Sequence, residues 1–531
     1  MPEKQIIFGK HVLESLSIGM YSDPLTVYRE YIQNSTDSLD EAIQIGLTNK
    51  ETAKIEILID SKERTITIRD NGVGVKADEA YNVLLDVANS QKDYHTTRGF
   101  RGIGRLGGLG CSRKLIFITS SKGERIKSII SWDCDTLLSL LARENKEVKT
   151  ALEVMEKVTA MSQEPENEDA HYFEVRLDDV YPSYNELLDS ILVENYLCTV
   201  SPIPFDSQLF CHTAKIKQKM LELGLGIEEY SIFLNESKKP LYKKYKNNVP
   251  TGNQAFNKKN DIVRSVDFLI DQDNAGKLTY FGWYGITNFY GSINDDNLLG
   301  LRLRKGNILI GDRNTCDKFF KSEKGRANSW FIGEIFVYDE KLVPNAKRDD
   351  FERNPAYTKF FDSLSRKADE LNRKHRRLMS EYHSCVKSIN DIISKINMIE
   401  SEVASIGITS ETRREKLTEQ HLEAQNKLEE KIKKLGKVLV KPLLDKTYVV
   451  SAEEINYKAN EIRKKQSIIE NKIINADYAT KLDLNTSFSK EQRKIYQTII
   501  SVIDEFFATE KETANALRVK IYEELNGNNK K

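Results

Sequence analysis

VYREYIQNSTDSLDEA at residues 27–42 is followed by ITIRDNGVGV at 66–75 and by RGFRGIGRLGGLG at 98–110. The first motif is rich in carboxylate and amide side chains, the second ends a strand-like run in Asp-x-Gly-x-Gly, and the third is rich in glycine. Oxygen ligands and free backbone N–H groups suit a magnesium-bound polyphosphate. Together the three motifs predict an ATP site around which the rest of the chain is organised.

The first motif predicts a helix, because apolar and small residues recur at three-to-four spacing and residues 25–45 contain no glycine or proline. Glu30, Asn34 and Asp37 stand at positions i, i+4 and i+7, so their side chains project from one helix face. Mg²⁺ takes a few oxygen ligands and keeps several waters, which suits Asn34, and Glu30 can polarise an attacking water. The alternative is the solvated face of an amphipathic helix.

The second motif follows a predicted β-hairpin, since residues 54–60 and 64–70 both alternate apolar and polar side chains. Asp70, at the end of the second strand, can accept a hydrogen bond from an exocyclic amine such as that of adenine. Gly72 and Gly74 allow positive φ and a close approach of a flat ligand to the backbone. The alternative is an ordinary Asp-Asn-Gly turn.

The third motif supplies Gly99, Gly102 and Gly104, with more glycines after them and an apolar strand at 114–119. Backbone stripped of side chains leaves N–H groups that can form an anion-binding nest for phosphates. A single G-x-x-G-x-G is weak support, because it also describes a flexible surface loop. The specific signal is the ordered set of three motifs.

This ordered set resembles the GHKL ATPase superfamily, which includes gyrase B, HtpG-type heat-shock chaperones, histidine kinases and MutL, with the MORC ATPases as relatives. The glutamate at position 30 favours the HtpG, MutL and MORC arm, because the kinases usually lack it. The resemblance implies a general base, a Mg²⁺ ligand and an adenine anchor at Glu30, Asn34 and Asp70. It assigns the remaining nucleotide contacts to Asp37, Gly72, Gly74, Gly99, Gly102 and Gly104. Residues 77–101 would form the ATP lid.

The chain departs from the family pattern at one place. The family usually carries a Gly-Thr pair at the start of a late strand, with the threonine hydrogen-bonded near the adenine. The corresponding strand here is 172–177, and it is preceded by Asp169, Ala170 and His171. The resemblance therefore gives no counterpart for this adenine contact.

A domain junction is predicted near Ser201, where Pro202 and Pro204 follow a predicted helix. Beyond it, several runs are rich in β-branched and aromatic residues and predict a mixed α/β domain. These runs are 231–234, 263–270, 277–284, 301–310 and 330–337.

Two basic residues of this second domain are candidate sensors of the γ-phosphate. Residues 330–351 resemble the HtpG middle domain, where a glycine-bearing strand leads to a loop whose arginine reaches that phosphate. Arg348 aligns with this arginine, and Asp349 stands where the family has glutamate. MutL and gyrase use a lysine instead, for which Lys305 is the candidate. Either cation would offset charge as the bond breaks; the alternative for each is a surface ion pair.

The last third of the chain predicts an all-helical region. Residues 371–403 carry two heptad columns of mainly apolar residues, which indicate a coiled coil or a long helical hairpin. Gly407 would end this helix and Ser410 would cap the next one. Capping boxes at Ser451 and Ser489 predict two more helices.

The bulk composition sets the limits of these predictions. The chain has 531 residues, 30% of them charged, and a formal net charge of zero, so a wholly basic surface is excluded. Its six cysteines show no metal-binding spacing, and no signal peptide or long apolar run occurs, which predicts a cytoplasmic protein without a membrane partner. The short amphipathic pattern at 1–21 would cross to a partner subunit or pack on its own domain.

The predicted fold class is α+β. A GHKL α/β sandwich at 1–200 is followed by an α/β transducer domain at 201–358 and a helical, coiled-coil region at 359–531. The predicted activity is Mg²⁺-dependent ATP hydrolysis that closes a homodimeric clamp, with Glu30 and either Arg348 or Lys305 as catalytic residues. The clamp would act on DNA or on a DNA-processing partner such as a nuclease, in genome maintenance or phage defence. The alternatives are a chaperone-like protein remodeller and an ATP-locked scaffold.

Overall fold

The computed structural model describes two compact units, Met1–Asn372 and Arg373–Lys531. Some predicted features lie outside the described residues, namely Gly99, Gly102, most of the predicted lid, Gly407, Ser410 and Ser489. The described residues are 8–16, 23–86, 104–226, 228–252, 259–287, 291–405, 408, 411–439, 446–475, 490–507 and 511–527.

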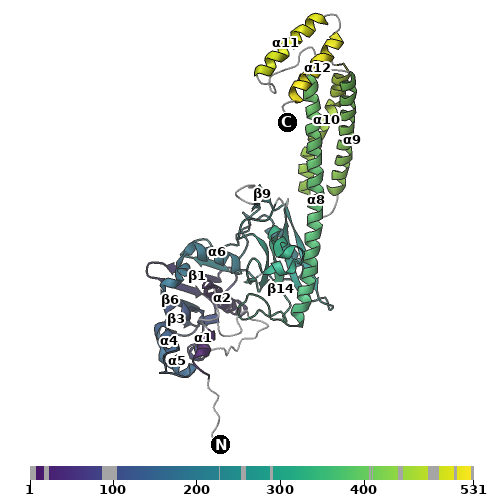
Figure 1. The fold of residues 1–531 in the computed structure, drawn as a ribbon. Helices are drawn as coiled ribbons and strands as arrows, with labels where there is room; N and C mark the ends of the chain where they lie inside the picture. Colours follow the sequence, from purple (N-terminus) through teal and green to yellow (C-terminus); the bar gives the residue numbers. More distant parts are fainter. Residues whose placement is uncertain are drawn as a thin grey trace. The chain divides into compact units, whose positions relative to one another are not determined.

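The first unit contains a seven-stranded sheet with the order β5-β4-β3-β6-β2-β1-β7. Figure 1 labels its strands β1, β3 and β6. The strands of this sheet are β1 Lys54–Asp60, β2 Thr65–Asp70, β3 Ser112–Ser120, β4 Ile126–Asp133, β5 Thr159–Pro165, β6 Tyr172–Val180 and β7 Ser231–Leu234. The predicted hairpin is confirmed, since β1 and β2 pair antiparallel with Ile57 opposite Ile68. Both residues are fully buried because alternate side chains of each strand face the core.

Helices cover this sheet and form its core with it. They are α1 His11–Leu16, α2 Thr26–Gln44, α3 Ala80–Leu85, α4 Cys134–Leu141, α5 Ala151–Val158 and α6 Ser190–Val200, with 3₁₀ turns η1 Gly104–Gly110 and η2 Pro182–Leu188. The predicted helix at the first motif is therefore confirmed as α2. Its residues Val27, Ile32 and Leu39 pack in one core cluster with Ile57 and Ile68. α2 is fixed against the sheet by this cluster, so the polar side chains of its other face have defined positions.

The chain returns to the first sheet after the predicted junction near Ser201. α7 Thr213–Glu222 is followed by β7, which pairs in parallel with β1, Lys54 lying opposite Ser231. The sequence placed this strand in the second domain, because its β-propensity says nothing about which strand it pairs with.

A second sheet, with the order β10-β11-β14-β12-β13, follows in the same unit. Its strands are β10 Ser265–Gln272, β11 Leu278–Ile286, β12 Gly300–Lys305, β13 Ile308–Ile310 and β14 Ile332–Val337, accompanied by the hairpin β8 Asn248–Thr251 and β9 Lys259–Ile262 and by η3 Thr315–Phe319 and η4 Ser322–Trp330. The prediction of a single strand at 301–310 was wrong, because this segment forms the two strands β12 and β13. Gly306 and Asn307 both have positive φ, 58° and 56°, and form a two-residue hairpin turn.

A buried ionic cluster connects the second sheet to α6. Glu334 is fully buried and accepts from Lys243 Nζ at 2.8 Å and from Arg304 Nε. The Arg304 Nη2 group donates to the carbonyl of Thr199, near the end of α6, at 2.8 Å. Because buried charges are stable only when they are paired, these contacts fix one arrangement of α6 and the second sheet.

The second unit is helical, as predicted. Its helices are α8 Pro355–Ser405, which begins in the first unit, α9 Glu411–Leu439, α10 Lys446–Asn475, α11 Lys490–Phe506 and α12 Lys511–Gly527. Within α8, the heptad residues Cys385, Ile389, Ile396 and Val403 are buried. The helix start predicted at Ser451 was wrong, because this residue lies inside α10. No helix among the described residues is long and apolar enough to cross a membrane.

Candidate active site

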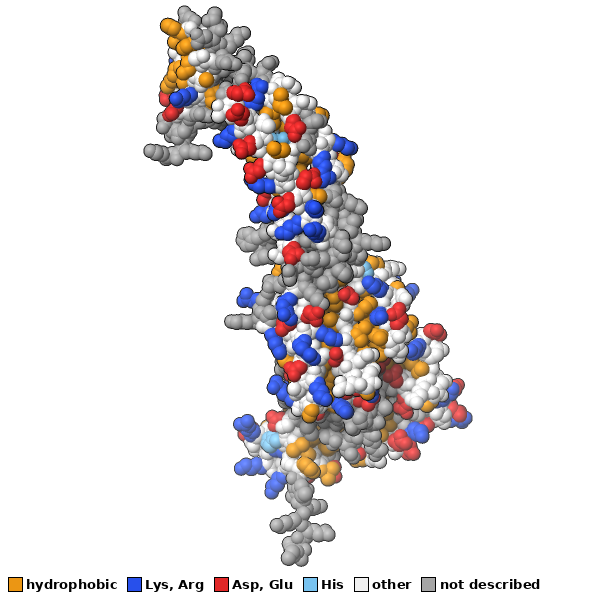
Figure 2. Space-filling model, turned by 90° about the vertical axis from the view of Figure 1, so that its right-hand side faces the viewer, with side chains coloured by type: hydrophobic (Ala, Val, Ile, Leu, Met, Phe, Trp, Pro, Cys, Tyr) orange, Lys and Arg blue, Asp and Glu red, His pale blue; other side chains and the backbone are white. Residues whose placement is uncertain are grey.

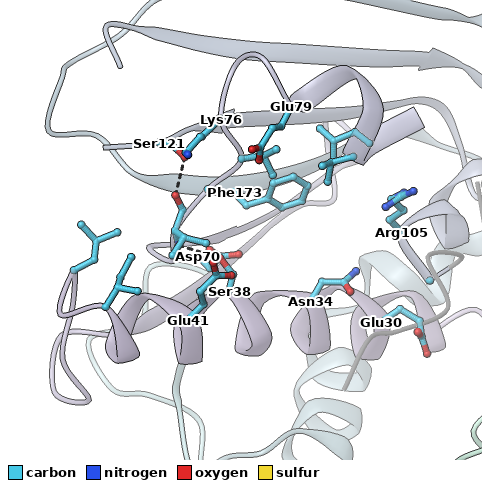
Figure 3. A pocket seen from close by; sticks show the side chains of 18 of the residues that line it. Glu30, Asn34, Ser38, Glu41, Asp70, Lys76, Glu79, Arg105, Ser121 and Phe173 are labelled. Carbon is cyan, nitrogen blue, oxygen red and sulfur yellow. Dashed lines mark hydrogen bonds between the residues drawn. The ribbon is translucent and has the colours of Figure 1, made fainter. Parts of the chain in front are cut away.

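A cavity of about 820 Å³ lies along α2 in the first unit. Figure 3 shows Asp70 and Ser38 toward one end of it, Glu30 and Arg105 at the other, and Asn34 between them. Its volume falls in the range of small-molecule pockets, roughly 300–1,000 Å³. The two ends differ in chemistry. One presents the buried Asp70 carboxylate next to a tight turn, and the other presents the Glu30 carboxylate together with the guanidinium groups of Arg105 and Arg348.

Asp70, the last residue of β2, is 1% exposed. Its Oδ1 accepts the backbone N–H of Gly72 at 2.9 Å, while its Oδ2 has no hydrogen-bond partner among the described residues. Burial raises the pKa of this carboxyl to about 6, although neighbouring hydrogen-bond donors oppose the rise. Because an unpaired buried acceptor is costly, Oδ2 suits a ligand that brings an N–H donor into the cavity.

Gly72 and Gly74 let the turn after β2 pack closely against its surroundings. A Cβ on Gly72 would lie 2.1 Å from Ser38 Oγ, and a Cβ on Gly74, whose φ is +68°, would lie 2.0 Å from the Ser120 carbonyl oxygen. Gly74 lines the cavity and Gly72 does not. Both glycines therefore allow other parts of the protein to approach the turn closely. The sequence suggested only the close approach of a flat ligand.

Glu30 and Asn34 line the cavity from α2, as their spacing predicts. Glu30 is buried, and its Oε1 lies 3.5 Å from Arg29 Nη2 and 3.5 Å from Arg348 Nε. Asp37, the third predicted residue of this face, is buried but does not line the cavity. The structure therefore brings two of the three polar residues of the motif to the cavity.

The third motif packs on the first through Tyr31. The Tyr31 hydroxyl donates to the carbonyl of Arg105 at 3.1 Å and accepts the N–H of Gly108 at 3.0 Å. A Cβ on Gly104 would lie 2.5 Å from Glu30 Oε2, so a side chain at this position would displace the carboxylate. Gly104 lines the cavity at the Glu30 end.

Residues 21–164 match a family model described as histidine kinase-, DNA gyrase B- and HSP90-like ATPase. The matched segment contains all three motifs, and their side chains or backbone meet at the cavity. Residues 21–164 are a GHKL-type ATPase domain.

The GHKL domain is similar to chaperone proteins HtpG of several bacteria. The identity to HtpG of Rhodococcus jostii is 32% over 87 residues, which are 15% of this chain and 14% of that protein. For HtpG of Halalkalibacterium halodurans it is 25% over 201 residues, 34% of this chain and 31% of that protein. HtpG of Dechloromonas aromatica is 27% identical over 143 residues, 23% of this chain and 22% of that protein. The chain thus spans less than a third of the length of these relatives.

The GHKL domain holds its glycine turn without the usual Gly-Thr pair. His171 Nδ1 lies 2.8 Å from the carbonyl oxygen of Gly72. On the neighbouring strand, the Thr119 hydroxyl accepts the N–H of Val75 at 2.8 Å and donates to the carbonyl of Tyr172 at 2.9 Å. The sequence did not identify these residues, because their role depends on the pairing of β3 with β6.

Phe173 is a cavity residue of the GHKL fold that the sequence analysis missed. It lines the cavity from β6, where it stands opposite Asp70 in the pairing of β2 with β6. Its position two residues after His171, within the predicted strand 172–177, was the available signal, since alternate residues of a strand face the same side of the sheet.

Arg348 reaches the GHKL cavity from the loop after β14. Its φ is +56°, its N–H donates to the carbonyl of Asn345 at 3.0 Å, and its own carbonyl accepts from Gly311 at 2.7 Å. Arg29 Nη2 donates to the carbonyl of Lys347 at 3.1 Å. The loop is therefore held both by the second sheet and by α2, which keeps Arg348 next to Glu30.

Lys305 does not line the GHKL cavity. Its Nζ donates to the carbonyl of Asp339 at 2.8 Å, and burial lowers the pKa of its ammonium group. Of the two candidate γ-phosphate sensors, the structure brings Arg348 to Glu30 and leaves Lys305 elsewhere in the second sheet.

A divalent cation in this GHKL site would depend on Asn34 and on phosphate oxygens. No group of three or more His, Cys, Asp or Glu side chains among the described residues could hold a metal ion. The amide oxygen of Asn34 is a hard ligand of the kind that Mg²⁺ accepts, and Mg²⁺ often has few protein ligands when it is bound to phosphates. The side chains present therefore fit a nucleotide-bound Mg²⁺ better than a permanent metal centre.

Proposed function

We propose that the chain binds ATP in this cavity and hydrolyses it, with adenine at the Asp70 end and the triphosphate at the Glu30 end. The observation that carries the proposal is a single cavity that joins the unpartnered Oδ2 of Asp70 to the carboxylate of Glu30. Asp70 fits the exocyclic amine of adenine as a hydrogen-bond acceptor, and the match of residues 21–164 to the ATPase family supports the same ligand.

In the proposed reaction, Glu30 is the general base. Its carboxylate takes a proton from the attacking water while the water oxygen bonds to the γ-phosphorus and the bond to the β,γ-bridging oxygen breaks. The products are ADP and inorganic phosphate. Arg348, whose Nε lies 3.5 Å from Glu30, is close enough to offset charge on the γ-phosphate in the transition state.

Asn34 is the proposed protein ligand for Mg²⁺, together with phosphate oxygens and water. It lines the middle of the cavity, between the adenine end and the phosphate end (Figure 3). When bound, Mg²⁺ supplies positive charge to the phosphate oxygens. Asn34 itself fixes where that charge lies relative to Glu30, one turn away on α2.

The position of Arg348 suggests how the nucleotide affects the rest of the protein. Its loop follows β14, so a contact with the γ-phosphate would pull on the second sheet as well as on the GHKL domain. This coupling would drive the opening and closing of a homodimeric clamp. The second sheet and its loop then act as the transducer domain.

Among the predicted clamp substrates, we favour a protein client. Relatives of the GHKL domain include chaperone proteins HtpG, at low identity, and the loop at residues 344–350 has the arginine that the resemblance requires. On the face of the helical unit shown in Figure 2, Lys and Arg side chains are interspersed with Asp and Glu among the described residues. No comparable observation among the described residues favours DNA as the substrate of the clamp, so the experiment below tests DNA as the alternative.

The test is phosphate release by the full chain with ATP and Mg²⁺, in the presence of an unfolded protein or of long duplex DNA, with Glu30→Ala as the blank. We expect turnover that is stimulated by the unfolded protein and unaffected by DNA at near-physiological salt. Absence of turnover above the Glu30→Ala blank would contradict the ATPase proposal. Stimulation by DNA alone would contradict the chaperone-like role.

A further inference from the structure

Arg105, the second residue of η1, places a guanidinium group at the cavity that the proposed reaction does not use. One of its terminal nitrogens donates to the carbonyl of Asp86. Its Nε is buried and has no hydrogen-bond partner among the described residues. A guanidinium carries five N–H donors, so Arg105 retains donors for a ligand in the cavity.

The backbone of Arg105 is fixed at the Glu30 end of the cavity. Its carbonyl accepts from the hydroxyl of Tyr31, the α2 residue directly after Glu30, at 3.1 Å. The preceding residue, Gly104, approaches Glu30 so closely that a Cβ on it would lie 2.5 Å from Oε2. Figure 3 shows Arg105 on the same side of Asn34 as Glu30, and Asp70 on the opposite side.

The surroundings of Arg105 compensate its charge only in part. Burial lowers the pKa of its guanidinium to about 10, and the carboxylate of Asp86 opposes that shift. The cavity side of the group has no carboxylate hydrogen-bonded to it in the described structure. An anionic ligand with several oxygens would supply the missing acceptors, and hydrogen bonds between charged partners are about twice as strong as neutral ones.

We propose that Arg105 binds the terminal phosphates of the nucleotide, so that η1 contributes a cation in addition to Arg348 of the loop after β14. This inference rests on the proposed ATP site and adds a residue to it. Arg105 then distinguishes a triphosphate from a monophosphate, whereas Asp70 recognises the base that both share.

The test compares the Kd values of AMP and of the β,γ-imido analogue of ATP, measured by calorimetry with Mg²⁺ for the full chain. Arg105→Gln should weaken binding of the triphosphate analogue roughly 10- to 100-fold, as expected for one charged hydrogen-bonding partner, and leave AMP within about twofold. Arg113→Gln is the matched control. Arg113 is an exposed arginine paired with Asp135 and Asp179 outside the cavity, so both affinities should stay unchanged.

The outcomes separate this inference from the proposed function. Wild-type protein that binds neither nucleotide would overturn the ATP site itself. If wild type binds both, then an unchanged triphosphate affinity in Arg105→Gln, or an equal loss for AMP, would overturn the role of Arg105 alone.

A second variant covers the case in which Arg105→Gln does not fold. Arg105→Lys keeps the positive charge but loses the planar fork, so the ratio of AMP to triphosphate Kd should fall about 3- to 10-fold. An unchanged ratio in Arg105→Lys would likewise overturn the proposal. Thermal unfolding of each variant shows whether it is folded before its affinities are compared.

Discussion

Arg348 Nε lies 3.5 Å from Glu30 Oε1, and the two side chains are 11% and 7% exposed. The proposed general base and the proposed sensor of the γ-phosphate thus meet at one end of the cavity, although they come from the first helix of the GHKL domain and from the loop after β14. Water screens the attraction between two such buried charges only weakly, so the loss of either side chain would change the electrostatic environment of the other.

Removal of the Arg348 side chain should slow the chemical step. Arg348→Ala is expected to lower kcat about 100-fold or more, because a preorganised cation at the γ-phosphate acts mainly in the transition state. The affinity for AMP should not change, since AMP has no γ-phosphate. Steady-state phosphate release and calorimetry measure the two quantities. Arg353→Ala, at an exposed position outside the cavity, is the control and should turn over ATP like wild type.

Glu30→Ala should retain ATP binding and lose hydrolysis. The carboxylate does not contact the base end of the cavity, and removal of a general base costs about 100- to 10,000-fold in rate. Glu41→Ala is a matched control, because Glu41 lies on the same helix and lines the same cavity. Turnover by Glu30→Ala within about tenfold of wild type would show that another group accepts the proton, and equal losses in both variants would point to a general effect on α2.

The sequence was sufficient for those parts of the site that local spacing determines. Glu30 and Asn34 lie one helical turn apart, and Asp70 ends a strand, so both local structures could be derived from neighbouring residues. The choice between Arg348 and Lys305 could not be derived from neighbouring residues, because it depends on how the second sheet packs against α2. Asp37 shows the limit of helical spacing, since a residue three positions beyond Asn34 has already turned away from the cavity.

The second sheet shows which signals were present but overlooked. Gly306 and Asn307 form a favoured two-residue hairpin turn between β12 and β13, but the strand-like residues on both sides of it were interpreted as one continuous strand. The parallel pairing of β7 with β1 has no comparable local sequence signal, because tertiary packing selects strand partners that are far apart in the chain. Phe173 became a site residue only through its register opposite Asp70.

Nucleotide affinity should depend on the protonation of Asp70. Its pKa of about 6 belongs to a buried acid, and the ionised form is the one that accepts a hydrogen bond from adenine. Affinity for AMP should therefore be nearly constant above about pH 7 and fall about tenfold as the pH is lowered from 7 to 5. Calorimetry between pH 5 and 8 measures this. Asp70→Asn should bind weakly at every pH, and a wild-type profile that is flat down to pH 5 would refute the role of the carboxylate.

Gly74→Ala should destabilise the GHKL domain and abolish nucleotide binding. The new Cβ would meet the Ser120 carbonyl oxygen at 2.0 Å in a backbone with φ of +68°, so the turn must shift, at a cost of about 3 kcal/mol or more. Gly123→Ala is the matched control. Gly123 also has positive φ, but its Cβ would meet nothing within 4 Å, so only backbone strain of about 1–2 kcal/mol remains. If thermal unfolding shows that Gly74→Ala and Gly123→Ala lose the same amount of stability, backbone strain alone, and not the contact with Ser120, explains why position 74 requires glycine.

Glu334→Gln tests whether the buried ionic cluster maintains the link between α6 and the second sheet. The substitution removes the carboxylate that pairs with Lys243 and Arg304, and two buried cations without their partner should cost about 3–5 kcal/mol. The control is Glu340→Gln, an exposed glutamate paired with Lys277, which should change stability by less than about 1 kcal/mol. Because Arg304 also donates to Thr199 of α6, turnover of ATP should fall in Glu334→Gln while AMP affinity is kept. If Glu334→Gln is destabilised but turns over ATP normally, the cluster stabilises the second sheet and does not couple the two sheets.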